Sequence, residues 1–310
     1  MINLVTGGAG FIGSNLINKL LSSGEIVICI DNFSTGHKRN ISEFFGNSNF
    51  SLIEGNICNP FNLKTDRIWH LASPASPDYY QENPIETAKT IFNGTQNVLE
   101  IAKKNKSPIL IASSSEVYGR TKNLPQTENN IGLVNPLCKR SCYSEAKRLS
   151  ETLSYDYLRK FNIDLRVVRL FNTYGPNMDP LDGRVISNFI CKTISKKSMQ
   201  INGEGLQTRS FCFIDDIIDG LIKVMDSNHK YPLNLGNPYE EHTILALANI
   251  IKLKLNTDIP LTFKKSREEE IFRRKPDITK ARKILNWNPN TTLSDGLSKT
   301  IDYFKKELNK

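Results

Sequence analysis

A tyrosine and a lysine four residues apart, Tyr143 and Lys147, are the residues best suited to proton transfer. Residues at this spacing share one face of a helix, and the stretch from Cys142 to Phe161 has helical periodicity. A cation beside a phenol favours the phenolate and lowers a pKa that is about 10 when unperturbed. By itself such a pair is most often an ordinary surface pairing. In a suitable setting, Tyr143 is expected to act as an acid–base group near neutral pH.

Three consecutive serines supply that setting. Ser113, Ser114 and Ser115 follow a β-rich run and precede Glu116. A hydroxyl at a strand end lies on the side where open α/β sheets bind ligands. The alternative is that the serines only stabilise a turn, but their combination with the tyrosine–lysine pair favours a reaction site.

A glycine-rich turn is the strongest local signal. Gly7, Gly10 and Gly13 are three residues apart, directly after a β-rich run and at the start of a helical one. Small residues let the backbone approach a diphosphate, which the helix N-terminus attracts. Asp31 lies at the end of the next β-rich run, where a carboxylate accepts hydrogen bonds from ribose hydroxyls and repels a 2′-phosphate. The pattern predicts NAD binding; a purely structural strand–turn–helix is the alternative.

The elements that position these residues alternate between strands and helices. Strands are predicted at Ile2–Thr6, Ile26–Ile30, Asn49–Ile53, Arg67–Leu71, Pro108–Ala112 and Leu165–Leu170. Helices are predicted at Phe11–Ser23, Ile85–Lys104 and Cys142–Phe161. This alternation predicts an α/β fold with a doubly wound parallel Rossmann sheet.

After Leu170 the pattern changes. A loop from Asn172 to Asp182 leads into four predicted helices and two short strands, which indicate a smaller mixed α/β lobe. The helices are Arg184–Ser195, Asp215–Met225, Thr243–Lys254 and Leu293–Leu308, and the strands are Arg209–Phe213 and Pro232–Leu235. We expect an NAD-binding domain over residues 1–171 and mainly a substrate-binding lobe over 172–310, with some segments returning to the first domain.

Together these motifs resemble the extended short-chain dehydrogenase/reductases that act on nucleotide sugars. Further segments narrow the resemblance to the UDP-glucuronate decarboxylases, also called UDP-xylose synthases. These segments are His70–Pro77, Ser114–Gly119, Asp182–Val185, Gln207–Phe211, Asn234–Pro238 and Arg274–Ile278. The resemblance extends from the first residues to the final helix.

The resemblance implies a reaction and roles for individual residues. UDP-glucuronate would be oxidised at C4 with bound NAD, lose CO₂ from the 4-keto intermediate, and be re-reduced to UDP-xylose. The implied catalytic residues are Ser114, Glu116, Tyr143, Lys147 and Arg209. The implied cofactor-binding residues are Gly7, Gly10, Phe11, Ile12, Gly13, Asp31, Asn32, Asn56, Ile57, Leu71, Tyr143 and Lys147. The implied substrate-binding residues are Tyr80, Glu82, Arg140, Asn172, Arg184 and Arg209, with Arg184 meeting the diphosphate. A homodimer formed by the two long helices, 85–104 and 142–161, is also expected.

The sequence departs from the family pattern at two positions. Asn56 stands where Asp is common, and Ser114 where many members carry Thr; both replacements keep a hydrogen-bonding group. A related 4,6-dehydratase would show Asp-Glu after the strand-end hydroxyl, whereas this chain has Ser115 and Glu116. A UDP-sugar 4-epimerase, which does not need Glu116 or Arg209, stays as the enzymatic alternative.

Composition excludes several other classes. The chain has 310 residues, of which 39% are apolar, and a formal charge of +9; low-complexity and disordered chains are excluded. No apolar run approaches the ~20 residues of a membrane helix. The scattered cysteines form no metal motif, and with no sign of a secretory signal they favour a cytoplasmic location.

The charge itself is mostly local. The segment from Lys252 to Lys283 holds eleven basic and five acidic residues, and we interpret it as basic surface away from the motifs. A nucleic-acid-binding or scaffold protein on a dehydrogenase fold is the alternative from another class, but the motifs favour a nucleotide sugar over nucleic acid.

Overall fold

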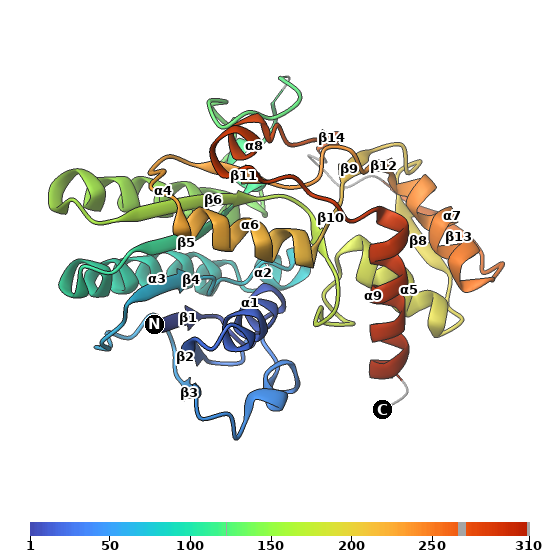
Figure 1. The fold of residues 1–310 in the computed structure, drawn as a ribbon. Coiled ribbons are helices and arrows are strands. Elements are labelled where there is room, and N and C mark those ends of the chain that lie inside the picture. The colour runs from blue at the N-terminus through green and yellow to red at the C-terminus, as the bar shows by residue number, and fades with distance from the viewer. Residues whose placement is uncertain (122, 266–270, 309–310) are drawn as a thin grey trace.

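A seven-stranded parallel sheet forms the centre of the molecule (Figure 1). The computed structural model describes residues 1–121, 123–265 and 271–308. The strand order is β11-β6-β5-β4-β1-β2-β3, which confirms the predicted doubly wound α/β sheet. The strands are β1 (Ile2–Thr6), β2 (Ile26–Asp31), β3 (Phe50–Glu54), β4 (Arg67–His70), β5 (Ile109–Ser114), β6 (Leu165–Leu170) and β11 (Leu233–Leu235).

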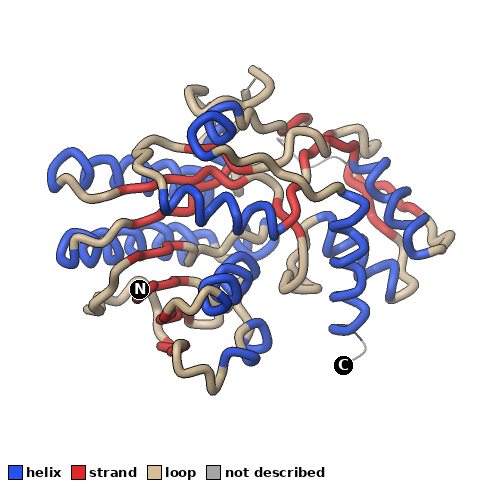
Figure 2. Tube along the Cα trace, in the orientation of Figure 1, coloured by secondary structure: helices blue, strands red, loops and turns tan. Residues whose placement is uncertain are grey.

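Both faces of the sheet are buried because successive strand residues point to opposite sides. Leu4, Ile68 and Ile109 pack in one cluster with α3 (Pro84–Asn105) and α4 (Ser141–Phe161). Their chain neighbours Val5, Trp69 and Leu110 pack in another with α1 (Phe11–Ser22) and α6 (Ile214–Asp226). Figure 2 shows these helices running alongside the strands. The sheet is therefore a buried scaffold, and its strand ends are the places left for binding.

The C-terminal part of the chain forms a smaller lobe beyond the carboxyl ends of the strands (Figures 1 and 2). Its helices are α5 (Val185–Ile194), α7 (Ile244–Leu255) and α9 (Leu293–Leu308). Its strands are β7 (Thr173–Tyr174), β8 (Met199–Asn202), β9 (Thr208–Ser210), β10 (Cys212–Phe213), β12 (Glu241–Thr243), β13 (Leu261–Lys264) and β14 (Arg273–Arg274). The first half also contains the short elements η1 (Lys38–Asn40), η2 (Ser42–Phe44), α2 (Pro77–Glu82) and η3 (Ser115–Tyr118).

The structure differs from the sequence-based expectation at several elements. The single strand expected at 209–213 is two strands, β9 and β10, which pair with β12 and β14 and with β7, respectively. The strands β8 and β13 were not predicted, since each is only four residues long and is held by the other. The strand β11 and the helix α8 (Thr279–Leu285) come from the second half and contact each other beside β6. The domain boundary between residues 171 and 172 stays a prediction.

Candidate active site

The glycine-rich turn leaves no room for side chains between β1 and α1. Gly7 has a φ of +71°, a left-handed conformation that favours glycine. A Cβ on Gly13 would lie 2.2 Å from the Gly7 carbonyl oxygen. Gly10 is the N-cap of α1, and no side chain of the described residues caps this end. The first N–H groups of α1 can therefore meet an anionic group such as a diphosphate.

Asp31 ties the end of β2 to the glycine-rich turn. One of its oxygens accepts a hydrogen bond from the Ala9 N–H at 2.9 Å, and the other accepts from the Phe33 N–H at 2.8 Å. Burial raises the pKa of Asp31, and the backbone N–H donors oppose this rise. Each carboxylate oxygen keeps a second lone pair, so the group can also accept from ribose hydroxyls.

The predicted cofactor residues line one cavity, with a single exception. Those that line it are Gly7, Gly10, Phe11, Ile12, Gly13, Asp31, Asn32, Ile57, Leu71, Tyr143 and Lys147. Asn56 is not among the lining residues, and its side-chain oxygen accepts a hydrogen bond from the Cys58 N–H at 2.9 Å. Asn56 therefore stabilises a turn here, and its role in cofactor binding stays a prediction.

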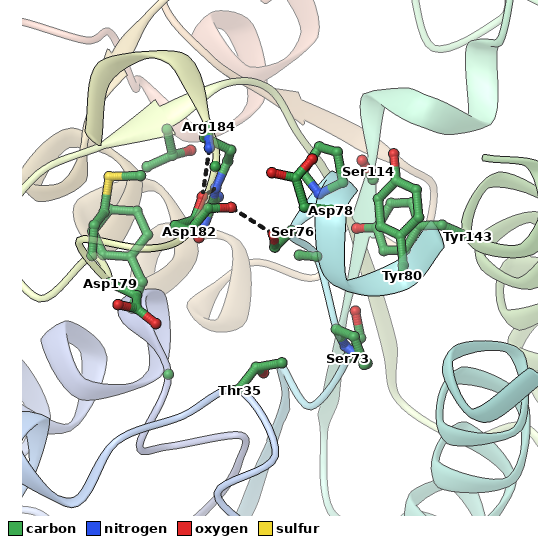
Figure 3. Close-up of a pocket in the computed structure, with 18 of the residues that line it drawn as sticks. Thr35, Ser73, Ser76, Asp78, Tyr80, Ser114, Tyr143, Asp179, Asp182 and Arg184 are labelled. Atoms are coloured by element: carbon green, nitrogen blue, oxygen red, sulfur yellow. Dashed lines mark hydrogen bonds and ion pairs between the residues drawn. The ribbon is translucent and has the colours of Figure 1, made fainter. Parts of the chain in front are cut away.

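Tyr143 lies on α4 with its ring stacked on Tyr80, at 5.0 Å between ring centroids and 9° between planes. Ser114, at the end of β5, lies beside this pair (Figure 3). Burial raises the pKa of Tyr143, although the Ser114 hydroxyl acts to lower it. The expected depression of this pKa is thus wrong for the structure as it stands, because desolvation outweighs the favourable contacts.

Lys147 is bound to the end of β5. Its Nζ lies 5.8 Å from the centroid of the Tyr143 ring and donates a hydrogen bond to the Ala112 carbonyl at 2.7 Å. Burial also lowers the pKa of Lys147 to about 8. The ammonium group is therefore held at the end of β5, one helical turn from the phenol.

Glu116 lies in η3 (Ser115–Tyr118) between two guanidinium groups. Arg140 and Arg274 both donate to its Oε1, at 2.7 and 2.6 Å. Burial alone would raise the pKa of Glu116, but the two arginines outweigh it and hold this pKa at about 2. Arg209, on β9, acts in the same direction. Within the described residues, the cluster thus brings the guanidinium groups of Arg140, Arg274 and Arg209 around Glu116, beside Tyr143.

A second charged group in the lining of the cavity is built around Arg184, the N-cap residue of α5. Its guanidinium forms a two-point ion pair with Asp182 and lies 5.8 Å from the centroid of the Phe11 ring (Figure 3). Glu82, at the end of α2, and Asn172 line the same cavity. Arg184 therefore lies near the start of α1, where the turn can hold a diphosphate. Its guanidinium group is already paired with Asp182.

All of these groups surround a single cavity of about 1440 Å³ between the sheet and the smaller lobe. Pockets for one small molecule typically measure about 300–1,000 Å³, so this volume has room for a dinucleotide and a second ligand. Among the described residues, no group of three or more His, Cys, Asp or Glu side chains could hold a metal ion. In the same part of the chain, no helix is long and apolar enough to cross a membrane.

Comparison with known proteins agrees with this site. Residues 4–300 match the profile of the family described as GDP-mannose 4,6 dehydratase. UDP-glucuronic acid decarboxylase 1 of Xenopus tropicalis is 46% identical over 98% of this chain and 72% of its own length. The Arabidopsis thaliana protein of the same name is also 46% identical, over 98% of this chain and 70% of its own length. The chain belongs to the UDP-glucuronic acid decarboxylase family.

Solved structures of other nucleotide-sugar enzymes resemble this family member. UDP-glucuronic acid 4-epimerase from Bacillus cereus, in complex with UDP-glucuronic acid and NAD, has a TM-score of 0.89 and 30% identity, covering 99% of this chain and 100% of its own. UDP-glucose 4-epimerase from Thermotoga maritima, with UDP-glucose, has a TM-score of 0.90 and 28% identity over the same shares of each chain. The architecture is thus that of the extended short-chain dehydrogenase/reductases.

One residue of the site was missing from the sequence-based assignment of this decarboxylase family member. Arg274 is buried and holds Glu116, although it comes from the basic segment that we interpreted as surface. Its neighbours Arg273 and Lys275 both pair with Glu241, so part of this segment's charge serves ion pairs next to the cavity. Residues 266–270 of the segment lie outside the described residues. One feature of the sequence could have indicated that Arg274 belongs to the site, namely the family-like run from Arg274 to Ile278.

Proposed function

We propose that this protein converts UDP-glucuronate to UDP-xylose and CO₂, with NAD that is reused in each cycle. One observation carries the proposal: the cationic cluster of Arg140, Arg274 and Arg209 around Glu116 adjoins Tyr143. Such a cluster suits a sugar that bears a carboxylate, and the acid–base tyrosine lies beside it. The family relationship supports the same substrate.

The chain's own residues fit the NAD that this reaction needs. The glycine-rich turn offers a close backbone approach and a free helix end, and Asp31 offers acceptors for ribose hydroxyls. Bound NAD supplies reversible two-electron oxidation at C4 of the sugar. Lys147 and Tyr143 line the same cavity as the turn, so the proton-transfer groups adjoin the proposed cofactor site.

Tyr143 would accept the O4 proton as the C4 carbonyl forms, while Ser114 donates a second hydrogen bond to O4. The new ketone is β to the C6 carboxylate. When the C5–C6 bond breaks, CO₂ leaves and the electron pair spreads into the C4 carbonyl as an enolate. Hydrogen-bond donors aimed at O4 stabilise that charge. A solvent-derived proton then adds to C5, and Tyr143 returns its proton to O4 as the carbonyl is reduced.

The remaining assigned residues would hold the UDP-sugar. Arg184 would meet the diphosphate, and Tyr80, Glu82, Arg140 and Asn172 would line the sugar and nucleotide positions, since all of them border the cavity. Arg209 would position the carboxylate or a proton-carrying water, because a guanidinium group keeps its proton in proteins and is a poor direct acid.

The experiment uses purified protein and UDP-glucuronate in D₂O, with the nucleotide products followed by mass spectrometry. The expected product is UDP-xylose that carries one deuterium at C5. UDP-galacturonate without loss of CO₂ would instead identify a 4-epimerase, the second candidate, which the similarity to the Bacillus cereus enzyme favours. Recovery of unchanged UDP-glucuronate would contradict both functions.

We also propose a cytoplasmic homodimer formed through α3 and α4. Ile85 on α3 is 71% exposed, and Leu149 and Phe161 on α4 are also exposed. These apolar side chains lie on the two helices that cover one face of the sheet. Light scattering should give twice the mass of the chain, and Leu149→Glu should reduce it to that of one chain. A monomeric wild-type protein would contradict the dimer.

A further inference from the structure

Three consecutive residues of β5 hold three residues of α4 that are each one helical turn apart. Ser114 lies beside Tyr143, and the Ala112 carbonyl accepts from Lys147 Nζ at 2.7 Å. The third contact is less expected: the Ser113 hydroxyl donates to Glu151 Oε1 at 2.5 Å. Glu151 therefore continues, by one turn, the face of α4 that carries the proton-transfer pair.

Glu151 is a buried carboxylate with a matched cation. Arg169, on β6, donates from Nε to Oε1 at 2.9 Å and from Nη2 to Oε2 at 2.7 Å. Ser113 and Arg169 are direct neighbours in the pairing of β5 with β6. The carboxylate thus bridges α4 to two central strands and does not reach the cavity, whose lining it does not join.

The same arginine extends the connection to the turn that carries Glu116. Arg169 Nη1 donates to the Tyr118 hydroxyl at 3.0 Å and to the Glu128 carbonyl at 2.9 Å. Tyr118 ends η3 and donates to Asn234 Oδ1, on β11, at 2.7 Å. One buried polar network therefore underlies both Lys147 and the turn of Glu116.

We propose that Glu151 is a positioning residue of the active site, whose buried negative charge keeps Lys147 in its charged, β5-bound form during catalysis. This inference rests on the proposed function for its catalytic consequence. It assigns Glu151 no contact with substrate or cofactor. Arg169 orients the carboxylate through two hydrogen bonds, and Ser113 fixes its distance from the strand end.

The charges around Lys147 support this role. The titratable groups that face it are Tyr143 and Glu151 from its own helix and His70 from β4. Burial lowers the pKa of His70 to about 3, so this imidazole is neutral near pH 7. Burial lowers the pKa of Lys147 as well, and Glu151 is the group that raises it. Without Glu151, Lys147 would lose its proton at lower pH.

The test measures the Lys147 pKa directly, by NMR titration of protein labelled with ¹³C at the lysine Cε. The signal is assigned by its loss in Lys147→Arg. In Glu151→Gln, the Lys147 pKa should fall by about one unit, the lower end of typical effects of an adjacent opposite charge. Glu151→Asp, which keeps the charge, should restore most of the shift. Glu145→Gln is the matched control, since Glu145 is a half-exposed carboxylate of the same helix.

A second variant separates charge from folding. Glu151→Gln alone leaves Arg169 as an unpaired buried cation, so the double variant E151Q/R169Q removes both charges. If Glu151 acts on Lys147, the Lys147 pKa in the double variant lies below that in R169Q, which lacks the same cation but keeps the carboxylate. Equal Lys147 pKa values in R169Q and in the double variant would overturn the proposal.

Turnover provides the remaining readout. The alkaline limb of the kcat profile should move to lower pH in E151Q by the same interval as the Lys147 pKa, and E151D should move it back. An unmoved limb despite a shifted pKa would overturn the catalytic part. Failure of the wild-type protein to act on UDP-glucuronate would contradict the proposed function instead, because the NMR titration needs no turnover.

Discussion

The two walls of the cavity are built in opposite ways. The cofactor wall is close-packed backbone, where Gly7, Gly10 and Gly13 allow the chain to turn and a buried neutral His70 ends β4. The substrate wall consists of charged side chains in pairs, as in Glu116 with Arg140 and Arg274 and Asp182 with Arg184. The cofactor wall depends on the close packing of its backbone, and the substrate wall depends on the balance of its charged side chains.

Because of this difference, substitutions in the two walls should have different effects. A change of shape at the glycine-rich turn should damage cofactor binding, because the residues of the turn itself carry no charged side chain. At the substrate wall, a change of charge at constant shape should be costly, since a buried ion without its partner is strongly unfavourable. Tyr143 lies where the walls meet and should be sensitive to the loss of a single oxygen.

The largest effect is expected for Tyr143→Phe. Loss of the hydroxyl removes the proposed proton acceptor, so the rate of CO₂ release should fall by about 10²–10⁴-fold. UDP-glucuronate should still bind, because the ring and its stacking on Tyr80 are kept. The matched control is Tyr155→Phe on the same helix, whose hydroxyl makes no hydrogen bond to the described residues. Equal rates in the two variants would refute the role of Tyr143.

Glu116→Gln should cause the largest loss of stability. The substitution keeps the size of the side chain but leaves Arg140 and Arg274 close together without their counter-charge. Breaking a buried pair in this way typically costs about 3–5 kcal/mol in the free energy of unfolding. Denaturant unfolding at pH 7 measures it. Glu82→Gln, at an exposed residue of the same wall, should stay within about 0.5 kcal/mol of wild type; similar losses in both would show that pairing is unimportant.

Gly13→Ala changes the shape of the cofactor wall without changing its charge. The new Cβ would lie 2.2 Å from the Gly7 carbonyl oxygen and 2.7 Å from the Gly8 Cα, so the turn must shift. Overpacking of this kind typically costs about 1–3 kcal/mol. The content of NAD after purification should fall, and the Kd measured by titration should rise. Gly55→Ala is the control on this wall, where the nearest atom would be 3.9 Å away; an unchanged Kd in Gly13→Ala would contradict the close approach.

The same contrast explains what the sequence could predict. The glycine-rich turn and the pair of Tyr143 and Lys147 depend on residues that are close in the chain, so spacing sufficed. Arg274 is 158 residues from Glu116, and no local pattern connects the two. The pairing of Arg184 with Asp182 depends on Gly183, whose φ of +78° turns the chain back. Lys147 binds a backbone carbonyl, an acceptor that every residue offers and no sequence reveals.

The position of strand β11 in the sheet also depends on contacts between residues that are distant in sequence. Its three residues from Leu233 to Leu235 form too short a run to identify a partner. Their place beside β6 is fixed by contacts distant in sequence, such as the hydrogen bond from the Asn234 N–H to Glu128. The sequence therefore predicted the class of fold and the local motifs, while the assembly of the charged wall required the structure.

The smallest effect should be a pH dependence that belongs to the cofactor wall alone. Burial lowers the pKa of His70 from 6.5 to about 3, and the ring bonds to Thr6 at 2.8 Å and contacts Thr95 at 3.3 Å. The unfolded chain takes up a proton at this histidine below about pH 6.5, whereas the folded protein does not, so stability falls as the pH falls towards 3. Between pH 7 and pH 5.5 the loss should be about 1 kcal/mol.

His70→Gln should remove this slope, and denaturant unfolding at the two pH values measures it. His229→Gln is the control, because His229 is only partly buried whereas His70 is buried. The pKa of Glu116 is about 2, so this carboxylate adds its own loss only below about pH 4.5, outside the interval. A slope between pH 7 and pH 5.5 that survives in His70→Gln would show that another group carries the pH dependence and would contradict this role of His70.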